Sequence, residues 1–333
     1  MYKKTKAKKF CLAIMSMILI CLFAPFFLTE ALAHEERTEQ VFDARPNGNL
    51  NIDADFGSVT IESWDRNEIK VIVIKETNQT SKSNAEELFG QYKVIYKKLD
   101  DGLEIRGEFP DEIRNRQLRV KFVVSVPKAC NLDIETSGGS ISVSDLKGDM
   151  ELRTSGGSLK LGDIAGNVNA RTSGGSITLA GADGIVNVKT SGGSISIGKT
   201  SGTINAKTSG GSITLDGSGG DVSAHTSGGS LKLMHIEGNI DASTSGGSIR
   251  VELTKQLNQD CRLETSGGTI KVYMKSDIAI DVDAATSAGK VSCELPLTVS
   301  SLLKSNKLKG QINGGGPLLK LRTSGGSIKI MEL

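Results

Sequence analysis

The stretch MELRTSGGSLKL, residues 150–161, is one unit of a repeat that decides the fold of this chain. Its tetrapeptide TSGG occurs seven times in succession at a spacing of 18 residues, and an uninterrupted period of this size is typical of a solenoid. The regular copies begin at Thr136, Thr154, Thr172, Thr190, Thr208, Thr226 and Thr244. Two further copies begin at Thr265 and Thr323, and a degraded copy, TSAG, begins at Thr286. The array therefore reaches almost to the last residue.

Apolar and polar residues alternate on both sides of each TSGG, as they do in a β-strand with one buried face. Around Thr172, for example, the apolar positions are Val168, Ala170, Ile177 and Leu179. Each repeat therefore predicts two short strands joined by a Gly-Gly corner. A single coil buries too few side chains to offset the loss of backbone entropy, whereas stacked coils pair their backbones and share one core.

The glycines are expected to form the corners of each coil. We expect the Gly-Gly pair to supply the positive φ angles of a tight turn, and a glycine twelve residues after each Thr, such as Gly166, to mark the other bend. The predicted fold class is all-β, a single-chain β-solenoid with 18-residue coils. Strand twist favours a right-handed β-helix, and the sequence leaves open whether its cross-section is flattened or triangular.

The repeat divides the chain into a predicted N-terminal β-rich cap region, residues 34–127, and a β-solenoid repeat domain, residues 128–333. The cap region contains Trp64 and lacks the 18-residue spacing, although residues 49–61 form a loose copy of the repeat. Its larger side chains are expected to seal the first coil. We expect further strands at 69–74, 92–96, 103–106 and 118–126, and a short helix at 83–89 capped by Ser83 or Asn84.

The C-terminal end of the array is less regular. The copies after Thr244 are unevenly spaced, and the run 295–309 is expected to be an insertion or a broken coil. The final coil, residues 323–333, is then expected to expose an unpaired strand edge. Such an edge is a template for another chain, which predicts end-to-end self-association through the C-terminal coil.

Residues 1–33 have the features of a secretory signal peptide. Lysines dominate the first nine residues, an apolar run extends from residue 10 to residue 28, and Ala31 and Ala33 mark a cleavage site near Ala33. The sequence therefore predicts export to the periplasm, the cell surface or the medium. An uncleaved N-terminal membrane anchor is the alternative.

Charge and cysteine content restrict the classes of function. The whole chain has 40 basic and 38 acidic residues, but five lysines and one glutamate lie in residues 1–33, so the remaining chain has a net charge of about −2. That balance and an exported location both argue against nucleic acid as a partner. Cys130, Cys261 and Cys293 form an odd count that argues against a disulfide framework, and the last two fall at inward positions of the repeat.

Several motifs resemble a known family. They are NLDIETSGGSI at 131–141, the iterated TSGGSI, and GQINGGG at 310–316 before a last repeat. Together they resemble the bacterial putative-adhesin family of β-strand-repeat envelope proteins, over essentially the whole of residues 34–333. The resemblance implies a single-chain β-solenoid outside the cytoplasm, with roles in adhesion and in sensing envelope stress. It carries over no catalytic or ligand residues.

The outward position just before each Thr forms a predicted basic column, which consists of Arg153, Arg171, Lys189, Lys207 and His225. In stacked strands these side chains would lie about 4.8 Å apart, and like charges at that distance repel unless an anion bridges them. A linear polyanion, such as an anionic envelope polysaccharide or a row of lipid headgroups, would bridge them. The alternative is a solvated structural face, balanced by Glu151, Asn169, Asn187 and Asn205.

Other chemistries fit the repeat poorly. A calcium-binding roll needs an aspartate at one fixed offset, and the aspartates of this array do not share one position throughout. The Thr and Ser columns are expected to fix the register by hydrogen bonding rather than to bind ice. Enzymes built on β-helices need long loops and clustered acids. In the N-terminal region, Asp100–Asp101 and Asp111–Glu112 fit turns better than a catalytic pair.

We therefore expect a non-catalytic exported β-solenoid that presents a repetitive surface in the bacterial cell envelope, for adhesion, scaffolding or envelope-stress sensing. The alternative function is binding of an anionic envelope polymer or polysaccharide through the basic column. A carbohydrate-active enzyme is the third hypothesis. No cofactor, metal site or catalytic residue is predicted, and the expected partner is an envelope component with anionic groups.

Overall fold

A computed structural model describes residues 34–79, 81–109, 117–299 and 305–333. These residues belong to one compact unit, Ala33–Leu333. The predicted signal peptide, residues 1–33, lies outside the described residues, as do Asp111 and Glu112. Within the described parts of the chain, no helix combines the length and the apolar character that a membrane span needs.

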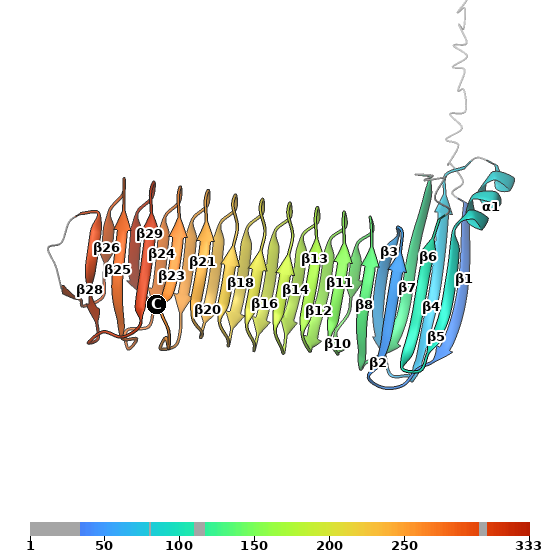
Figure 1. Ribbon diagram of the computed structural model, residues 1–333, viewed down its shortest axis with the longest axis horizontal. Helices are drawn as coiled ribbons and strands as arrows, with labels where there is room; N and C mark the ends of the chain where they lie inside the picture. The colour runs from blue at the N-terminus through green and yellow to red at the C-terminus, as the bar shows by residue number, and fades with distance from the viewer. Residues whose placement is uncertain (1–33, 80, 110–116, 300–304) are drawn as a thin grey trace, which may run out of the picture. The chain divides into compact units, whose positions relative to one another are not determined.

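Each 18-residue coil contributes one strand to each of two sheets, which confirms the predicted β-solenoid (Figure 1). Sheet B takes the strands before each Thr: β8 (Cys130–Thr136), β11 (Met150–Thr154), β13 (Val168–Thr172), β15 (Val186–Lys189), β17 (Ile204–Lys207), β19 (Val222–His225), β21 (Ile240–Thr244) and β23 (Cys261–Thr265). Sheet A takes the strands after each corner: β9 (Ile141–Val143), β12 (Leu159–Ala165), β14 (Ile177–Ala182), β16 (Ile195–Thr200), β18 (Ile213–Ser218), β20 (Leu231–Ile236), β22 (Ile249–Leu253) and β24 (Ile270–Met274). A short strand, β10 (Leu146–Lys147), pairs with β12.

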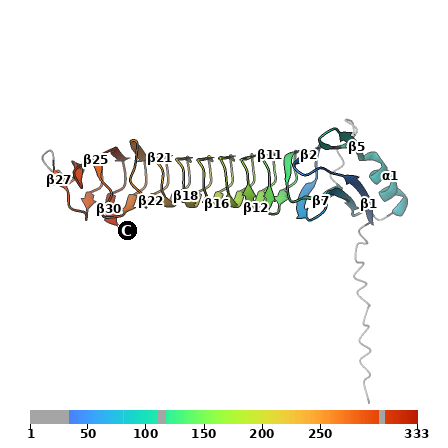
Figure 2. The same ribbon diagram turned by 90° about the horizontal axis from the view of Figure 1, so that it is seen from below.

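The cross-section is flattened, with two layers of strands joined at each coil (Figure 2). Neighbouring coils pair in parallel and in register, so that Val168 lies beside Val186 in sheet B and Ile177 beside Ile195 in sheet A. The inward side chains of both sheets are buried, as the alternation predicted. Cys130 and Cys261 are buried among them as free thiols, while Cys293 is half-buried and also free.

The corner glycines are required for a reason that differs from the predicted one. Among the described glycines, those of the TSGG corners do not have positive φ angles, so that prediction was wrong. The second glycine of each pair instead packs against the preceding coil. A Cβ on Gly175 would lie 2.0 Å from the carbonyl oxygen of Gly157, and one on Gly193 would lie 2.1 Å from that of Gly175. Close approach of two backbones therefore selects glycine here.

The threonine of each TSGG is buried and connects neighbouring coils. The Thr172 hydroxyl donates to the carbonyl oxygen of Gly157, in the coil before, at 2.8 Å, and accepts from the Gly175 amide at 3.3 Å. The corner serines form a second ladder, in which the Ser176 amide donates to the Ser158 hydroxyl at 3.2 Å. The hydroxyl columns therefore connect neighbouring coils, but they bond to backbone groups rather than to each other as expected.

The N-terminal region continues both sheets. Strands β2 (Gly48–Ala54) and β3 (Ser58–Trp64) form a coil that pairs with β8 and β9. On its other side lie β6 (Gly102–Glu108) and β7 (Leu118–Pro127), each parallel to its neighbour. Antiparallel strands complete the two sheets at this end: β5 (Lys93–Leu99) in sheet B, and β4 (Glu68–Thr77) followed by β1 (His34–Asp43) in sheet A.

Large side chains fill this end of the core, as predicted. Phe56, Tyr92, Phe109 and Phe122 form a cluster of tilted rings. The predicted helix is α1 (Lys82–Gln91), but its N-cap residue is Ser81, which forms no side-chain capping bond, so neither expected cap is correct. Tyr92 ends the helix rather than starting a strand, and its hydroxyl donates to the Phe56 carbonyl oxygen at 3.1 Å.

At the other end, the coils do not follow the order of the sequence. Residues 266–333 also form β25 (Ile280–Thr286), β26 (Val291–Cys293), β27 (Thr298–Val299), β28 (Lys307–Ile312), β29 (Leu318–Thr323) and β30 (Ile328–Glu332). The last coil, β29–β30, lies between the coil of β23–β24 and the coil of β25–β26. In Figure 1 the C-terminus accordingly lies within the stack.

This order contradicts the expectation that residues 323–333 expose an unpaired edge. Strand β30 has a partner on each side, and so has β29. Strands β28 and β27 extend sheet B beyond β25 in antiparallel fashion. The C-terminal coil has no free backbone edge, so the structure does not support the edge on which the predicted end-to-end association depends.

Candidate functional site

The predicted basic column lies on the outward face of sheet B, one residue per strand. Arg153, on β11, is in register with Arg171 on β13, which is followed by Lys189 on β15 and Lys207 on β17. His225 on β19 is in register with Lys207. The structure thus brings all five predicted residues together, with the interstrand spacing of about 4.8 Å that a β-sheet imposes.

The first member of the column is already neutralised. The Arg153 guanidinium lies 2.5 Å from the Glu151 carboxylate, and its other terminal nitrogen lies 3.8 Å from Asp133. Glu151 was the expected counter-charge, whereas Asp133 was missed. It could have been found from the repeat, because Asp133 and Glu151 occupy the same position in neighbouring coils. Arg153 is therefore a structural ion pair rather than a free cation.

The next three members have no such partner. Arg171, Lys189 and Lys207 are exposed, and none of them forms an ion pair with any carboxylate in the described parts of the chain. They stand in successive strands with no acid between them. This segment of the column is defined here as the cation ladder. It carries three positive charges in a row on a chain whose overall charge is close to balanced.

Asparagine side chains line the cation ladder on one side. Asn169, Asn187 and Asn205 are in register two residues upstream of the cations. The Asn205 amide donates to the Asn187 side-chain oxygen at 2.9 Å, and the Asn169 amide donates to Glu151 at 2.7 Å. A shallow groove of about 390 Å³ runs between the asparagines and the cations. The groove therefore offers both amide groups and positive charge along its length.

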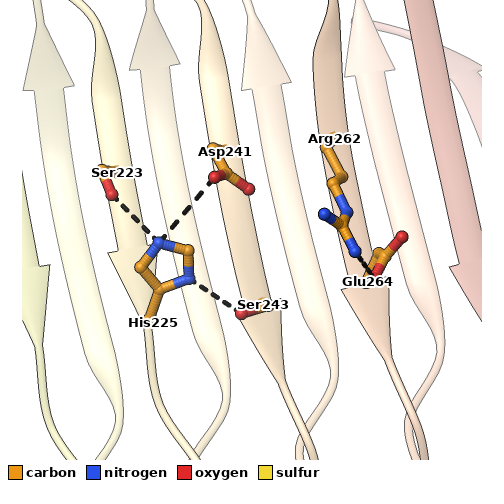
Figure 3. Close-up of polar contacts among 6 residues, drawn as sticks. All are labelled: Ser223, His225, Asp241, Ser243, Arg262 and Glu264. Carbon is orange, nitrogen blue, oxygen red and sulfur yellow. Dashed lines mark hydrogen bonds and ion pairs between the residues drawn. The ribbon is translucent and has the colours of Figure 1, made fainter.

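His225 ends the ladder and is held by neighbouring side chains (Figure 3). Its Nε2 atom lies 3.0 Å from the Ser223 hydroxyl and 4.0 Å from an Asp241 oxygen, while Nδ1 lies 2.8 Å from the Ser243 hydroxyl. The imidazole is half-buried in this network. His225 is therefore less free than the three cations before it to bind a ligand.

Acidic charge limits the column beyond His225. Ser243 follows in register on β21, and Glu264 follows on β23. Arg262 donates to the Glu264 carboxylate at 2.5 Å (Figure 3), and this hydrogen bond lowers the pKa of that carboxyl below its ordinary value. Glu264 is therefore firmly anionic. The positive segment is bounded by the Arg153–Glu151 pair at one end and by Asp241 and Glu264 at the other.

A larger groove of about 790 Å³ runs along the threonine and serine corners between Lys207 and Lys307. Its threonine hydroxyls are occupied. Thr208 and Thr226 donate to glycine carbonyls of the preceding coils at 2.8 Å, and Thr244 does so at 2.7 Å. This groove is therefore a feature of the corner geometry, and its threonine hydroxyls serve the fold.

The described residues contain no group of three or more His, Cys, Asp or Glu side chains arranged to hold a metal ion. Asp100 and Asp101 lie in the turn between β5 and β6, as predicted. The Asp101 carboxylate accepts a hydrogen bond from Asn49 at 2.6 Å, which is a structural role for that turn residue.

One family model and several solved structures are similar to this chain. A model of the family described as Toastrack DUF4097 matches residues 47–331. Among solved structures, a putative adhesin from Parabacteroides distasonis is 12% identical, covers 90% of this chain and 97% of its own, and has a TM-score of 0.41. A putative adhesin from Bacteroides fragilis is 12% identical with the same coverage and a TM-score of 0.32. A putative lipid binding protein from Parabacteroides distasonis is 13% identical, again over 90% and 97%, with a TM-score of 0.31. No curated protein matches the chain.

Proposed function

This chain belongs to the Toastrack DUF4097 family, and on that premise we propose that it is a non-catalytic β-solenoid of the bacterial envelope that binds a linear anionic polymer through its cation ladder. The observation that carries the proposal is the row formed by Arg171, Lys189 and Lys207, three exposed cations on successive strands without a carboxylate partner. Export, which this function requires, is proposed from residues 1–33.

Electrostatics support a bridging anion. Two unit charges about 4.8 Å apart in water repel by about 0.9 kcal/mol, so each neighbouring pair in the ladder disfavours the extended parallel arrangement. An anionic group between two cations converts that repulsion into attraction. A solvated face that served the fold alone would have no reason to keep three like charges together, and the neutralised Arg153 shows that the repeat can supply an acid at this site.

The shape of the site supports a polymer rather than a small anion. The groove beside the ladder is shallow and extends over several strands, so it cannot enclose a small molecule. Each additional strand repeats the same contacts, which suits a ligand that repeats its own charged group. The amides of Asn187 and Asn205 could hydrogen-bond to hydroxyl or carbonyl groups of such a polymer. Binding of this kind would anchor the solenoid in the envelope, as adhesion or scaffolding requires.

The test compares the purified protein with the variant R171Q/K189Q/K207Q, with polygalacturonate and long-chain polyphosphate as probes. Each lost charge is expected to remove about 1 kcal/mol, so polymer binding at the ladder should weaken about 100-fold and the amount of polymer bound per protein molecule should fall. Parent binding should also weaken steeply as salt rises from about 0.1 M to about 1 M, which shortens the Debye length from about 10 Å to about 3 Å. Fluorescence anisotropy of labelled polymer measures both effects.

A matched control removes the same charge elsewhere. Lys147, Lys160 and Lys199 are exposed, and their register neighbours are uncharged. The variant K147Q/K160Q/K199Q should therefore bind both probes as the parent does. A ladder variant that matches the parent both in affinity and in the amount of polymer bound would contradict the proposed function, as would an equal loss in the ladder variant and in this control.

A further inference from the structure

A second column of cations lies on the outward face of sheet A. It consists of Lys232 on β20, Arg250 on β22, Lys271 on β24 and Lys329 on β30, each in register with the next. Thr214 precedes it and Ser292 follows it, so this segment spans four strands. We call this segment the sheet A column.

The inserted C-terminal coil builds this column. Lys329 stands six residues after its repeat threonine, as Lys271 does, but the coil that contains Thr286 separates the two in the sequence. Because β30 pairs with β24, Lys329 lies beside Lys271. If the coils stacked in the order of the sequence, Ser292 would take that place. The column therefore exists only in the folded arrangement.

The lysines of the sheet A column have no acidic partner. Lys232, Lys271 and Lys329 are exposed, and none forms an ion pair with any carboxylate in the ranges that the structure describes. On sheet B at the same end of the solenoid, several cations have acidic partners instead. There, Asp283 pairs with Arg322 at 2.8 Å and with Lys309 at 3.4 Å.

Arg250 differs from the lysines because it is paired with Glu252 and held in place, so the free positive charges of the column are those of the three lysines. Its guanidinium donates to Glu252 at 2.8 Å and to the Tyr273 hydroxyl at 3.2 Å, and its central carbon lies 4.1 Å from the centre of the Tyr273 ring. Glu252 is buried and Tyr273 half-buried. This cluster fixes the position of the Arg250 guanidinium in the middle of the column.

Hydroxyl groups border the column on the side of the corner. The Ser248 amide donates to the Ser230 hydroxyl oxygen at 3.1 Å, and the Thr269 amide donates to the Ser248 hydroxyl oxygen at 3.1 Å. Both hydroxyls act as acceptors in these bonds, so their own hydrogens remain to donate outward. Ammonium and hydroxyl donors side by side are suited to the oxygens of phosphate or carboxylate groups.

We propose that the sheet A column is a second binding site for a linear polyanion that carries phosphate or carboxylate groups. The inward faces of the two sheets pack against each other, so their outward faces point in opposite directions. One molecule can therefore hold two polymer chains, one on each face, and act as a cross-bridge. Binding at sheet A is independent of the cation ladder, whereas cross-bridging rests on the proposed function as well.

The test for the site uses the variant R171Q/K189Q/K207Q as background, with polyphosphate and polygalacturonate as probes. Adding K232Q/K271Q/K329Q to that background should lower the remaining affinity about 100-fold, for the loss of three charges. Adding K147Q/K160Q/K199Q instead should leave it unchanged. No further loss from the sheet A substitutions would overturn the site, even if the proposed function at sheet B holds. Arg250 is left unchanged because its removal would leave the buried Glu252 unpaired.

Cross-bridging is measured by dynamic light scattering of polymer mixed with protein. The parent should produce large aggregates at comparable concentrations of protein and polymer that dissolve at high salt, whereas each triple variant should bind polymer without enlarging it. Aggregates of parental size from the sheet A variant would overturn the bridging role. Far-ultraviolet circular dichroism must match the parent for each variant, and since all six substituted side chains are exposed, the fold should be retained.

Discussion

The close contact at the corner glycines leads to a prediction for Gly157→Ala. A Cβ at this position would lie 2.1 Å from the Gly139 carbonyl oxygen, where real Cβ atoms keep beyond 3.0 Å. The coil would have to move by roughly 1 Å, which strains the packing by about 1 to 3 kcal/mol. The same movement stretches the 2.7 Å hydrogen bond from Thr154 to the Gly139 oxygen, which contributes about 1 kcal/mol. We expect a loss of about 2 to 4 kcal/mol in the free energy of unfolding.

The neighbouring glycine provides the control. A Cβ on Gly156 would lie 3.6 Å from its nearest neighbour, an ordinary contact, and its φ angle is not positive. Gly156→Ala should therefore be neutral or stabilise by up to about 1 kcal/mol, because alanine restricts the unfolded chain. Urea unfolding followed by circular dichroism gives both values. Hydrogen exchange should show faster opening near residue 157 alone, since each coil contacts only its neighbours. Equal urea midpoints for the two variants would refute the close-approach argument.

Two further predictions concern the thiols and the C-terminal coil. Burial raises the pKa of Cys130 to about 12 and that of Cys261 to about 11, so at pH 8 both should be almost entirely protonated in the folded protein. A disulfide reagent should then modify half-buried Cys293 first, with all three thiols reacting only in denaturant, and rapid modification of Cys130 in the native protein would contradict this. Deletion of residues 317–333 removes β29 and β30 and leaves the facing edges of β23 and β25 unpaired. Such a protein should lose stability and aggregate, and a monomeric truncated protein with the parent's urea midpoint would show that the inserted coil is dispensable.

The candidate site shows where a repeat is sufficient for prediction. Arg171, Lys189 and Lys207 share one offset from the threonine, so parallel in-register stacking alone places them in one row. The repeat offset does not predict which of these cations has an acidic partner. That depends on the residue two positions upstream in the same strand, which varies from coil to coil. Glu151 reaches Arg153, while Asn169 one coil later has no charge to offer Arg171.

The glycine corners show a second kind of limit. Glycine is compatible both with a positive φ angle and with a close backbone contact, and the sequence does not distinguish these two requirements. Only the positions of neighbouring coils reveal that Gly157 lies against Gly139. The prediction that the corner needs glycine was therefore correct, although the expected reason was wrong.

The sequence by itself determined the solenoid, its two strands per coil and its buried face, because these follow from local alternation repeated at a fixed period. The tertiary structure alone decided the order of the coils after Thr265. There the spacing becomes irregular, and β29–β30 can pair with either neighbour because all coils present the same backbone edge and nearly the same inward side chains. Because the last coil is inserted, β29 and β30 are paired with a strand on each side. The same insertion places Lys329 beside Lys271. Contacts between residues so far apart in the chain depend on which coil packs on which, and no local pattern encodes that choice.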